Sequence, residues 1–539
     1  MADPDHPCPG GRSAIALPID RSPNPRPPWL TPPALADLAE FKQDVRAYYD
    51  RLAPFRDQWY ARNRAYYAFL ESRLRLLVPP AQAVLELGCG TGNLLANLQP
   101  ARALGIDVSP RMIEIAARKY PRLQFRVDDA ETVEHPQPFD YIIASDLVGD
   151  LLDIGAMLDR VHALSHGQTR LILTFHNPAL EGVLRMAQRA GAAMAPARRN
   201  WIGPGDLDNL LQLGDFVVEH QESGLLLPLP IPMLAPLANR HLARLPGPRY
   251  FNLVNIVVAR PVRPRPRPKP LTCTVVIPCR NEVNNIEAAI VRMPDLGTHT
   301  EILFVDGSST DGTVERIATL QARYHGQKDI KLLHQTAQPR TTAPTPDRTD
   351  PNAPVAMLKL GKGDAVRKGF DAASGDVLMI LDADLTVPPE DLPAFYAPLA
   401  TGKADFINGT RLVYPMEEQA MKFVNYAGNK FFSLLFTWLL GQRIRDTLCG
   451  TKALRKQDYL RIKAGRAYFG EFDPFGDFDL LFGAARLKLK IVDVPVRYRR
   501  RVAGVTKVRI LKHGWLLLAM CVMAFRKFKL TPRRTPTGP

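Results

Sequence analysis

The sequence predicts an α/β protein made of two doubly wound domains. In two parts of the chain, short apolar runs of strand length are followed by a glycine-rich or polar turn and then by a helical pattern. This alternation is typical of parallel sheets covered by helices on both faces. Between the two parts lies RPVRPRPRPKP, residues 260–270, in which proline alternates with basic residues and favours an extended linker. A length of 539 residues also exceeds what one ordinary domain holds.

Composition narrows the class of protein. A hydrophobic fraction of 46% allows real cores, and a net charge of +16 favours anionic partners. The first residues have no apolar segment, so we expect no signal peptide, and no apolar run reaches the roughly 18 residues of a membrane span. The six cysteines are scattered and form no CxxC pair, which predicts free thiols in a reducing cytoplasm and no zinc site.

The order of the patterns divides the chain into five expected segments. We expect a disordered tail over 1–35, a first domain over 36–260, a linker over 261–270, a second domain over 271–512, and an apolar and basic C-terminal helix and tail over 513–539. The first domain begins with a helical stretch rich in aromatic residues, which we interpret as a lid. Within the second domain, 338–354 is rich in Pro, Thr and Asp and predicts a mobile loop.

The first domain carries a glycine turn between a strand and a helix. Residues 83–98 read AVLELGCGTGNLLANL, and Asp107 follows a second short strand, 21 residues after Glu86. Glycines let the backbone approach a ligand, and the helix beyond them offers free N–H groups. An acid at the end of the next strand suits ribose hydroxyls. The layout predicts a nucleoside-binding site.

These motifs resemble those of class I methyltransferases that use S-adenosylmethionine. The likeness covers ELGCGTGN, GIDVSPRMIEIA, FRVDDAE (125–131) and FDYIIASDLVGDLLD (139–153), and it implies a Rossmann-like methyltransferase fold. It also implies S-adenosylmethionine as cofactor. The cofactor-binding residues that it implies are Glu86, Gly88 and Gly90 on the methionine and ribose side, Asp107 on the ribose hydroxyls, Asp129 near the adenine and Asp146 beside the methyl-transfer cleft. By position, Phe175–Pro178 and Trp201 are expected to shape the acceptor pocket.

The second domain delivers polar residues to the carboxyl ends of three successive strands. The first strand ends at Pro278 and is followed by Asn281 and Glu282, whereas Asp306 ends the next strand. Asp382 and Asp384 follow the apolar run 377–381. Ligands of open α/β sheets bind outside these strand ends, and two carboxylates there favour Mg²⁺ together with substrate phosphates.

This set of motifs resembles glycosyltransferase family 2, the inverting nucleotide-sugar enzymes with a GT-A fold, and within it the dolichyl-phosphate mannose synthases and bacterial polyprenyl-phosphate glycosyltransferases. IPCRNE, FVDGSSTDGT, GKGDAVRKGF, SGDVLMILDADL and RDTLCGTKAL occur in the family's order between about 271 and 510. One position departs from the pattern: Gly307 stands where the family more often has a second acid, so the choice of nucleotide base, uracil or guanine, stays open.

The resemblance implies a role for each residue. Asp382 and Asp384 would hold Mg²⁺ or Mn²⁺, and the catalytic set would be Asp382, Asp384, Asp477 and Arg411. The nucleotide-sugar would meet Pro278, Asn281, Glu282, Asp306, Lys362 and Asp382, with Arg367 as a further phosphate contact. Asp477 or Asp479 would serve as the acceptor-side acid, Arg411 with Lys430, Arg443 and Arg445 would hold an acceptor phosphate, and Asp446 would be structural or orienting.

The acceptor is a polyprenyl phosphate or a glycan hydroxyl. A lipid phosphate is already an anion and needs no base, whereas a hydroxyl requires one. Residues 425–445 and 514–530 are apolar with basic flanks, and each suits an anionic membrane surface or a buried core helix. Nucleic acid is the rival partner for the positive charge, and the sequence contains no recognised motif for it.

Together these features predict a bifunctional enzyme that is peripheral on the cytoplasmic face of a membrane. Its C-terminal domain would transfer a sugar with inversion from a nucleotide-sugar, and its N-terminal domain would methylate a product of the same glycan or lipid-linked pathway. The alternative is an active glycosyltransferase joined to a methyltransferase-like domain that only recruits or regulates.

Overall fold

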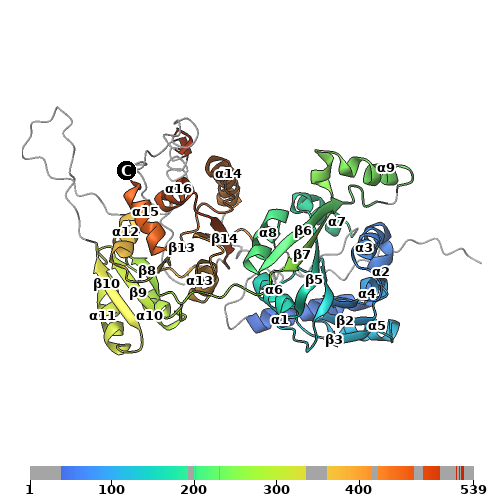
Figure 1. Ribbon diagram of the computed structural model, residues 1–539, viewed down its shortest axis with the longest axis horizontal. Coiled ribbons are helices and arrows are strands. Elements are labelled where there is room, and N and C mark those ends of the chain that lie inside the picture. The colour runs from blue at the N-terminus through green and yellow to red at the C-terminus, as the bar shows by residue number, and fades with distance from the viewer. Residues whose placement is uncertain are drawn as a thin grey trace, which may run out of the picture. The chain divides into compact units, whose positions relative to one another are not determined.

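The computed structural model describes residues 38–191, 200, 202–229, 231–335, 361–414, 423–466, 478–497, 518, 521, 522 and 524–526. The chain divides into two compact units, Met1–Arg263 and Pro264–Pro539. Figure 1 labels most of the helices and strands of both units. Each unit contains one seven-stranded sheet, and each is described by itself.

The N-terminal unit is built on a mostly parallel sheet. In spatial order its strands are β3 (Gln124–Val127), β2 (Arg102–Asp107), β1 (Ala83–Leu87), β4 (Phe139–Ser145), β5 (Ser165–His176), β7 (Val254–Pro261) and β6 (Phe216–Gly224). Only β7 runs antiparallel to its neighbours in this sheet. Because the order reverses between β1 and β4, the carboxyl ends of these central strands flank the position where α/β sheets bind ligands.

Nine α-helices surround this sheet in the described part of the unit. They are α1 (Leu38–Leu52), α2 (Arg56–Arg62), α3 (Arg64–Leu77), α4 (Asn93–Ala96), α5 (Pro110–Lys119), α6 (Ile154–Ala163), α7 (Glu181–Arg189), α8 (Pro204–Leu213) and α9 (Leu234–Arg240). Apolar residues of α3, including Leu70 and Leu74, pack with β1, β4, β5 and β7 in one core. Leu52 at the end of α1 and Trp59 within α2 pack instead against Met112 of α5. The first three helices are therefore anchored to the sheet and lie close to its ligand-binding edge.

The C-terminal unit is also built on a mostly parallel sheet, which differs from the first in its last strands. In spatial order its strands are β10 (Asp329–His334), β9 (Thr300–Asp306), β8 (Cys273–Cys279), β11 (Val377–Ile380), β13 (Lys452–Arg455), β12 (Phe406–Thr410) and β14 (Ile491–Pro495). Only β13 is antiparallel within this sheet. The strands β9, β8 and β11 are parallel neighbours, so their carboxyl ends meet at one edge.

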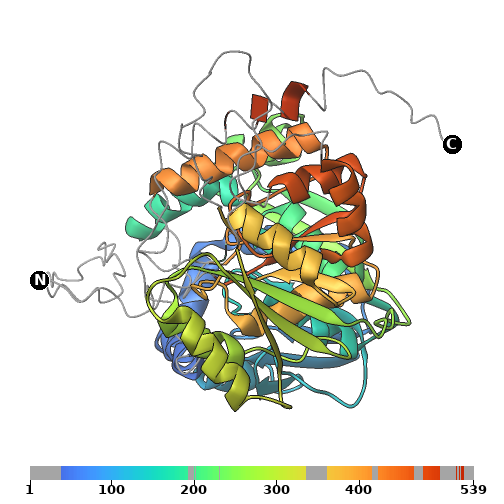
Figure 2. The ribbon, with the colours of Figure 1, turned by 90° about the vertical axis from the view of Figure 1, so that its left-hand side faces the viewer.

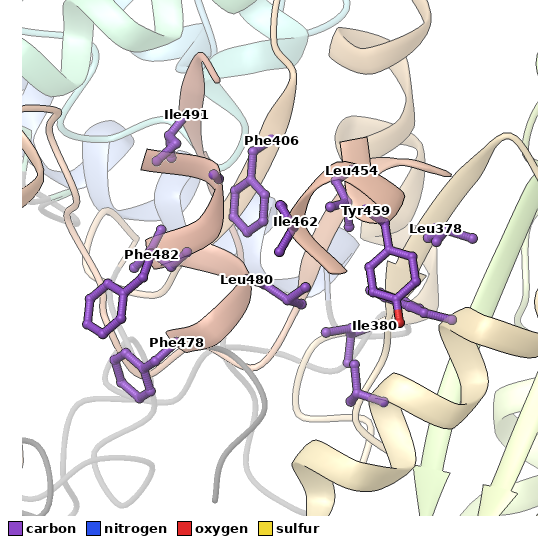
Figure 3. Packing of buried hydrophobic residues seen from close by; sticks show 14 of the residues in the cluster. Leu378, Ile380, Phe406, Leu454, Tyr459, Ile462, Phe478, Leu480, Phe482 and Ile491 are labelled. Carbon is purple, nitrogen blue, oxygen red and sulfur yellow. The ribbon is translucent and has the colours of Figure 1, made fainter. Parts of the chain in front are cut away.

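Seven α-helices lie in the described part of this unit, and Figure 2 shows the ribbon from a second side. They are α10 (Val283–Val291), α11 (Thr313–Arg323), α12 (Lys362–Ala372), α13 (Leu392–Ala400), α14 (Phe423–Leu440), α15 (Lys456–Ala464) and α16 (Phe478–Arg486). Helices α10 and α11 pack on each other, whereas α12, α14, α15 and α16 share a core with the sheet. Figure 3 shows this core, in which Tyr459 and Ile462 lie near Leu454, and Phe478 lies near Phe482. Burying such large side chains stabilises the unit by about 1.5–3 kcal/mol each.

The fold predicted from the sequence is confirmed. The expected strand and helix on either side of the glycine turn are β1 and α4, and the apolar run 377–381 contains β11, which ends one residue earlier. The antiparallel direction of β7 and β13 was not anticipated, because the direction of a strand leaves no trace in its periodicity. Among the described residues, no helix is both long and apolar enough to cross a membrane.

The five expected segments stay a prediction. The expected tail over 1–35, the loop over 338–354 and most of the C-terminal segment over 513–539 lie outside the described residues. In the expected linker, β7 extends to Pro261, and Arg263 donates hydrogen bonds to the carbonyl oxygens of His162 and Ser165. Lys269 already belongs to the second unit, and its N–H donates to the carbonyl of Ala400 at 3.0 Å.

Candidate active sites

The glycine turn of the N-terminal unit has a backbone that requires glycine. Gly88, Gly90 and Gly92 have φ of +70°, +53° and +78°. A Cβ at Gly88 would lie 2.9 Å from Cδ1 of Leu147, and one at Gly92 would lie 2.8 Å from Cζ of Phe125. Because these glycines have positive φ and no side chain, the turn presents backbone N–H groups just after the end of β1.

Two carboxylates of the predicted nucleoside site lie behind this turn. Asp107 accepts hydrogen bonds from the N–H groups of Gly90 and Ser109, each at 2.9 Å. Glu86 is 2% exposed and accepts from the N–H of Leu95 at 3.1 Å. Burial raises the pKa of Asp107 above its usual value and raises that of Glu86 to about 8. Asp107 thus ties the ends of β1 and β2 together, and Glu86 braces α4 from inside.

The other two predicted cofactor residues contact the N-terminal helices. Asp129 lies 2.5 Å from Nζ of Lys42, which also lies 3.1 Å from Glu131. Asp146, with φ of +56°, accepts a 2.5 Å hydrogen bond from the hydroxyl of Tyr66. The sequence alone identified neither partner, because such contacts join residues about 80 or more positions apart in the chain.

Arg56 is a further residue at this site that the sequence did not single out. Its Nη1 donates to the hydroxyl of Tyr67 at 2.6 Å, and its Nε would lie 3.5 Å from a Cβ at Gly90. Burial opposes its charge, yet Tyr67, Tyr49 and Asp146 together raise the pKa of Arg56 above its usual value. A permanent cation therefore lies beside the glycine turn, where it offsets the carboxylates.

Helix α2 also holds the far side of the turn. Asp57 accepts hydrogen bonds from Thr91 at 2.7 Å and Asn93 at 3.0 Å, and it pairs with Lys119. Helices α1 to α3 thus touch the carboxyl ends of β1, β3 and β4, as a lid would. We call α1, α2 and α3, residues 38–77, the helical lid.

A pocket opens at the carboxyl ends of β4 and β5. It is lined by Asp146, Val148, Gly149, Phe175, His176, Asn177, Pro178, Glu181, Leu184, Asn200 and Ile202. Phe175 to Pro178, expected at the acceptor pocket, thus line the same pocket as Asp146. Trp201 lies outside the described residues.

In the C-terminal unit, Asp382 and Asp384 follow β11 and are both partly exposed, whereas Ala383 between them is buried. Nζ of Lys362 lies 2.5 Å from Oδ1 of Asp382, and Asp384 accepts from the N–H and hydroxyl of Thr386 at 3.2 and 2.9 Å. A Cβ at Gly450 would collide with both Asp382 and Lys362. The RDTLCG segment therefore closes on the carboxylate pair, a contact that the sequence did not indicate.

The expected nucleoside side lies at the ends of the neighbouring strands. Asp306 is 2% exposed and accepts from the N–H groups of Ser308 and Ser309 at 3.0 and 3.2 Å. The N–H of Asn281, which has φ of +56°, donates to the hydroxyl of Ser309 at 3.0 Å. Glu282 accepts from Nδ2 of Asn285 at 2.8 Å.

Two smaller features complete this side of the site. Pro278 is the register partner of Val305 in the β8–β9 pair, one residue before the strand ends. A Cβ at Gly307 would lie 3.0 Å from Oε1 of Gln335 and 3.5 Å from Cβ of Arg280, so the departure from the family pattern falls between two polar side chains.

Arg411 is held by a buried carboxylate. Its Nε and Nη2 donate to Asp446 at 2.7 and 2.9 Å, and Asp446 is fully buried. Arg445 donates to the carbonyl of Leu412 at 2.6 Å, and burial lowers its pKa to about 10. Arg367 lies 3.6 Å from Asp479. Asp477 and the side chain of Lys430 lie outside the described residues.

The roles assigned to these residues therefore remain predictions, while their places are clear. Asn281, Glu282, Asp306, Asp382 and Asp384 follow three adjacent parallel strands at one edge of the sheet. Among the described residues, no group of three or more His, Cys, Asp or Glu side chains is arranged as a complete metal site. Two carboxylates at a strand end can instead share a cation with substrate phosphates.

Comparison with known families assigns each unit. Residues 60–221 match the family described as "Methyltransferase domain", and residues 274–338 and 357–461 match "Glycosyl transferase family 2".

Two curated relatives resemble the second unit. A dolichol-phosphate mannosyltransferase of Pyrococcus furiosus is 27% identical over 241 residues, which are 44% of this chain and 59% of the relative. An undecaprenyl-phosphate mannosyltransferase of Micrococcus luteus is also 27% identical over 241 residues, 43% of this chain and 86% of that protein. The chain thus spans about three fifths of the archaeal relative's length.

Among solved structures, a methyltransferase of Thermotoga maritima, described as SAM-dependent and as a possible histamine N-methyltransferase, is 16% identical with a TM-score of 0.33. The match covers 40% of this chain and 99% of that one. With both family matches and both sheets in view, the chain joins a domain that matches the methyltransferase family to a domain that matches glycosyl transferase family 2.

Proposed function

We propose that the C-terminal domain transfers a sugar, with inversion, from a nucleotide-sugar to a polyprenyl phosphate. The observation that carries this proposal is the set of acidic residues that follow β8, β9 and β11 at one sheet edge. Asp306 and Glu282 would hold the nucleoside, and Asp382 with Asp384 would face the diphosphate. The names of the two relatives support a lipid phosphate as acceptor.

Asp382 and Asp384 would hold a divalent cation, Mg²⁺ or Mn²⁺. The ammonium of Lys362 already lies against Asp382, so this carboxylate occupies a place where positive charge is favourable. When bound, the ion would act as a Lewis acid that stabilises the leaving diphosphate. Lys362 would then be available to the phosphates, and the absence of a side chain at Gly450 lets that segment approach Asp382 and Lys362 closely.

The acceptor decides whether a base is needed. A polyprenyl phosphate attacks as an anion, and Arg443 or Arg445 would steer it. Arg411 would act with them or, through its bond to Asp446, would position the loop that carries them. If a glycan hydroxyl were the acceptor, Asp477 or Asp479 would take its proton.

The N-terminal domain, we infer, transfers a methyl group from S-adenosylmethionine within the same glycan or lipid-linked pathway. The turn at Gly88 and Gly90 offers bare backbone to the cofactor, and Asp107, held by two N–H groups, keeps lone pairs for ribose hydroxyls. Asp129 would lie near the adenine and Asp146 near the reacting methyl group. Arg56 supplies the positive charge that the carboxylate of the cofactor requires.

Two exposed surfaces support a peripheral position on the cytoplasmic face of an anionic membrane. The segment between β6 and β7, residues 225–253, contains Arg240, Arg244 and Arg249 and no acidic residue. Its exposed apolar side chains are Leu229, Ile231, Met233, Leu234, Leu237, Leu242, Leu245, Tyr250 and Phe251. Apolar side chains interleaved with arginine suit anionic headgroups, whereas a protein partner would need a matching acidic and apolar face.

The second surface is on α14 of the other unit. Phe431, Leu434 and Trp438 are exposed and recur at helical spacing, so they lie on one face. Such a face suits the boundary between headgroups and acyl chains, where a polyprenyl acceptor resides.

Sugar transfer is tested with the purified full chain, a panel of uridine and guanosine diphosphate sugars and a short-chain polyprenyl phosphate. We expect product that requires Mg²⁺ or Mn²⁺, a loss of at least 100-fold in Asp382→Asn, and normal turnover in Asp295→Asn, an exposed control. Normal binding of the donor without transfer to any polyprenyl phosphate would refute the proposed acceptor.

Methyl transfer is tested first by calorimetry with S-adenosylmethionine. We expect binding in the wild type and in Asp159→Ala, an exposed control on α6, and at least tenfold weaker binding in Asp107→Ala. Absence of heat with the wild type would favour a domain that only recruits or regulates.

A further inference from the structure

The pocket beside Asp146 has an unusual polar lining. Among its described lining residues, the polar side chains are Asp146, His176, Asn177, Glu181 and Asn200, and none is lysine or arginine. Glu181 is paired with Arg185 at 2.5 Å, whereas the carboxylate of Asp146 and the amides can accept hydrogen bonds from a neutral ligand.

His176 is held at the mouth of this pocket by the helical lid. Its ring stacks on Tyr66 with centroids 5.4 Å apart and planes at 15°. Its Nδ1 lies 4.0 Å from Oδ1 of Asp146. The ring comes from the last residue of β5, so its position is fixed by the sheet on one side and by α3 on the other.

Asp146 is itself fixed on both oxygens. Oδ2 accepts from the hydroxyl of Tyr66 at 2.5 Å, and Oδ1 accepts from the hydroxyl of Thr174 at 3.3 Å. A carboxylate held in this way near an imidazole favours the protonated ring, because opposite charges lie close together. His176 can therefore receive a proton at Nε2, the nitrogen that is not directed to Asp146.

Asn200 provides an independent sign of a ligand. It is 5% exposed, and its Nδ2 donates to the carbonyl oxygens of Val148 and Leu151 at 3.0 and 2.7 Å. These bonds fix the orientation of the amide, and within the described part of the chain its Oδ1 has no hydrogen-bond partner. A buried acceptor without a donor is costly unless a ligand supplies one.

We propose that this pocket takes a neutral, hydroxyl-rich methyl acceptor such as a sugar, and that His176 is the general base of an O-methylation. The proposal rests on the proposed methyl transfer from S-adenosylmethionine. The acceptor hydroxyl passes its proton to Nε2 of His176 while its oxygen forms a bond to the methyl carbon. The bond between that carbon and sulfur breaks, its electron pair goes to sulfur, and the neutral thioether leaves.

The identity of the base explains the class of acceptor. An alcohol is a weak nucleophile until its proton is removed, whereas a neutral amine attacks without a base. A phosphate or carboxylate acceptor would be repelled by Asp146, whose carboxylate lines the pocket.

The experiment uses the full chain with methyl α-mannoside, mannose 1-phosphate and propylamine as acceptors. We expect methylation of methyl α-mannoside alone. His176→Gln should lower kcat at least 100-fold while calorimetry shows S-adenosylmethionine binding within twofold of the wild type. His166→Gln is the matched control, since His166 pairs with Asp140 at 3.0 Å at the beginning of β5, away from the pocket.

Two further readouts separate a catalytic from a structural role of His176. Added imidazole should restore activity to His176→Ala, and the pH profile of kcat should lose its imidazole limb in His176→Gln. NMR titration of the ring should show a lower pKa in Asp146→Asn than in the wild type.

Each contrary outcome has a distinct meaning. Failure of the wild type to bind S-adenosylmethionine would overturn the proposed methyl transfer itself. Normal cofactor binding with methylation of only the phosphate or the amine, with no methylation of any probe, or with full activity in His176→Gln, would overturn the present proposal alone.

Discussion

Replacing Asp446 by asparagine tests how the C-terminal domain holds the loop that carries its basic residues. Asp446 is fully buried and accepts hydrogen bonds from the backbone N–H, Nε and Nη2 of Arg411 at 3.1, 2.7 and 2.9 Å. It also accepts from Nδ2 of Asn429 at 2.7 Å and from the N–H of Leu448 at 2.9 Å. Asparagine keeps the shape but leaves the charge of Arg411 buried and unbalanced.

The magnitude follows from the burial of this pair. Removing one partner of a buried ion pair costs about 3–5 kcal/mol, because the remaining charge is desolvated without compensation. A change of 1 kcal/mol shifts the melting temperature of a domain of this size by about 2–4 °C. We therefore expect Asp446→Asn to lower the melting temperature of the C-terminal unit by roughly 6–20 °C.

Differential scanning calorimetry of the full chain measures this shift, with the exposed variant Asp295→Asn as control. A double variant, Asp446→Leu with Arg411→Met, should regain part of the lost stability, because no isolated charge remains while Nδ2 of Asn429 and the N–H of Leu448 lose their acceptor. A loss below 1 kcal/mol in Asp446→Asn would refute the reasoning.

The pH dependence of stability also tests the contribution of the ion pair between Asp446 and Arg411. Burial opposes ionisation, but Arg411, Asn429 and Leu448 hold the pKa of Asp446 well below its usual range. A depressed carboxyl pKa contributes stability that is present above the unfolded value near 4 and is lost as pH falls toward the folded value. The difference between wild type and Asp446→Asn should therefore shrink below about pH 4.

Three other changes give distinct results. Gly450→Ala puts a methyl group against Asp382, so sugar transfer should fall at least tenfold while methyl transfer stays unchanged; equal loss of both activities would point to general misfolding. Burial raises the pKa of Glu86 to about 8, so the stability of the N-terminal unit should decline as pH rises from about 5 to 8, and Glu86→Gln should flatten this decline in melting curves recorded across that range; an unchanged slope would contradict the inference. Leu237→Glu should reduce flotation with vesicles containing phosphatidylglycerol, whereas Val217→Glu, on β6, should not; binding to phosphatidylcholine alone, or a dimer disrupted by Leu237→Glu, would argue against an anionic bilayer.

The sequence predicts those parts of this protein that depend on local pattern. The strand at 83–87, its glycine turn and the acid Asp107 at the end of the next strand follow from periodicity and residue type. So do Asp382 and Asp384 after β11. Because the strands are parallel, each of these acids lies at the ligand-binding edge of its own sheet.

Contacts between distant segments could not be predicted in the same way. Tyr66 meets Asp146 only because α3 packs across the sheet, and Gly450 meets Asp382 only because β13 returns antiparallel beside β11. The sequence placed His176 only within the stretch Phe175–Pro178 expected at the acceptor pocket. Its relation to a carboxylate and an aromatic ring is seen only in the structure.

The pairing of β8 with β11 also constrains how the C-terminal half acquires its function. Cys273 is the register partner of Val377, so the two innermost strands come from stretches more than 100 residues apart. A chain still being synthesised cannot close this pair until Ile380 has left the ribosome, and contacts of such long range form slowly. Any fragment that stops short of that strand would retain Glu282 and Asp306 yet lack Asp382 and Asp384.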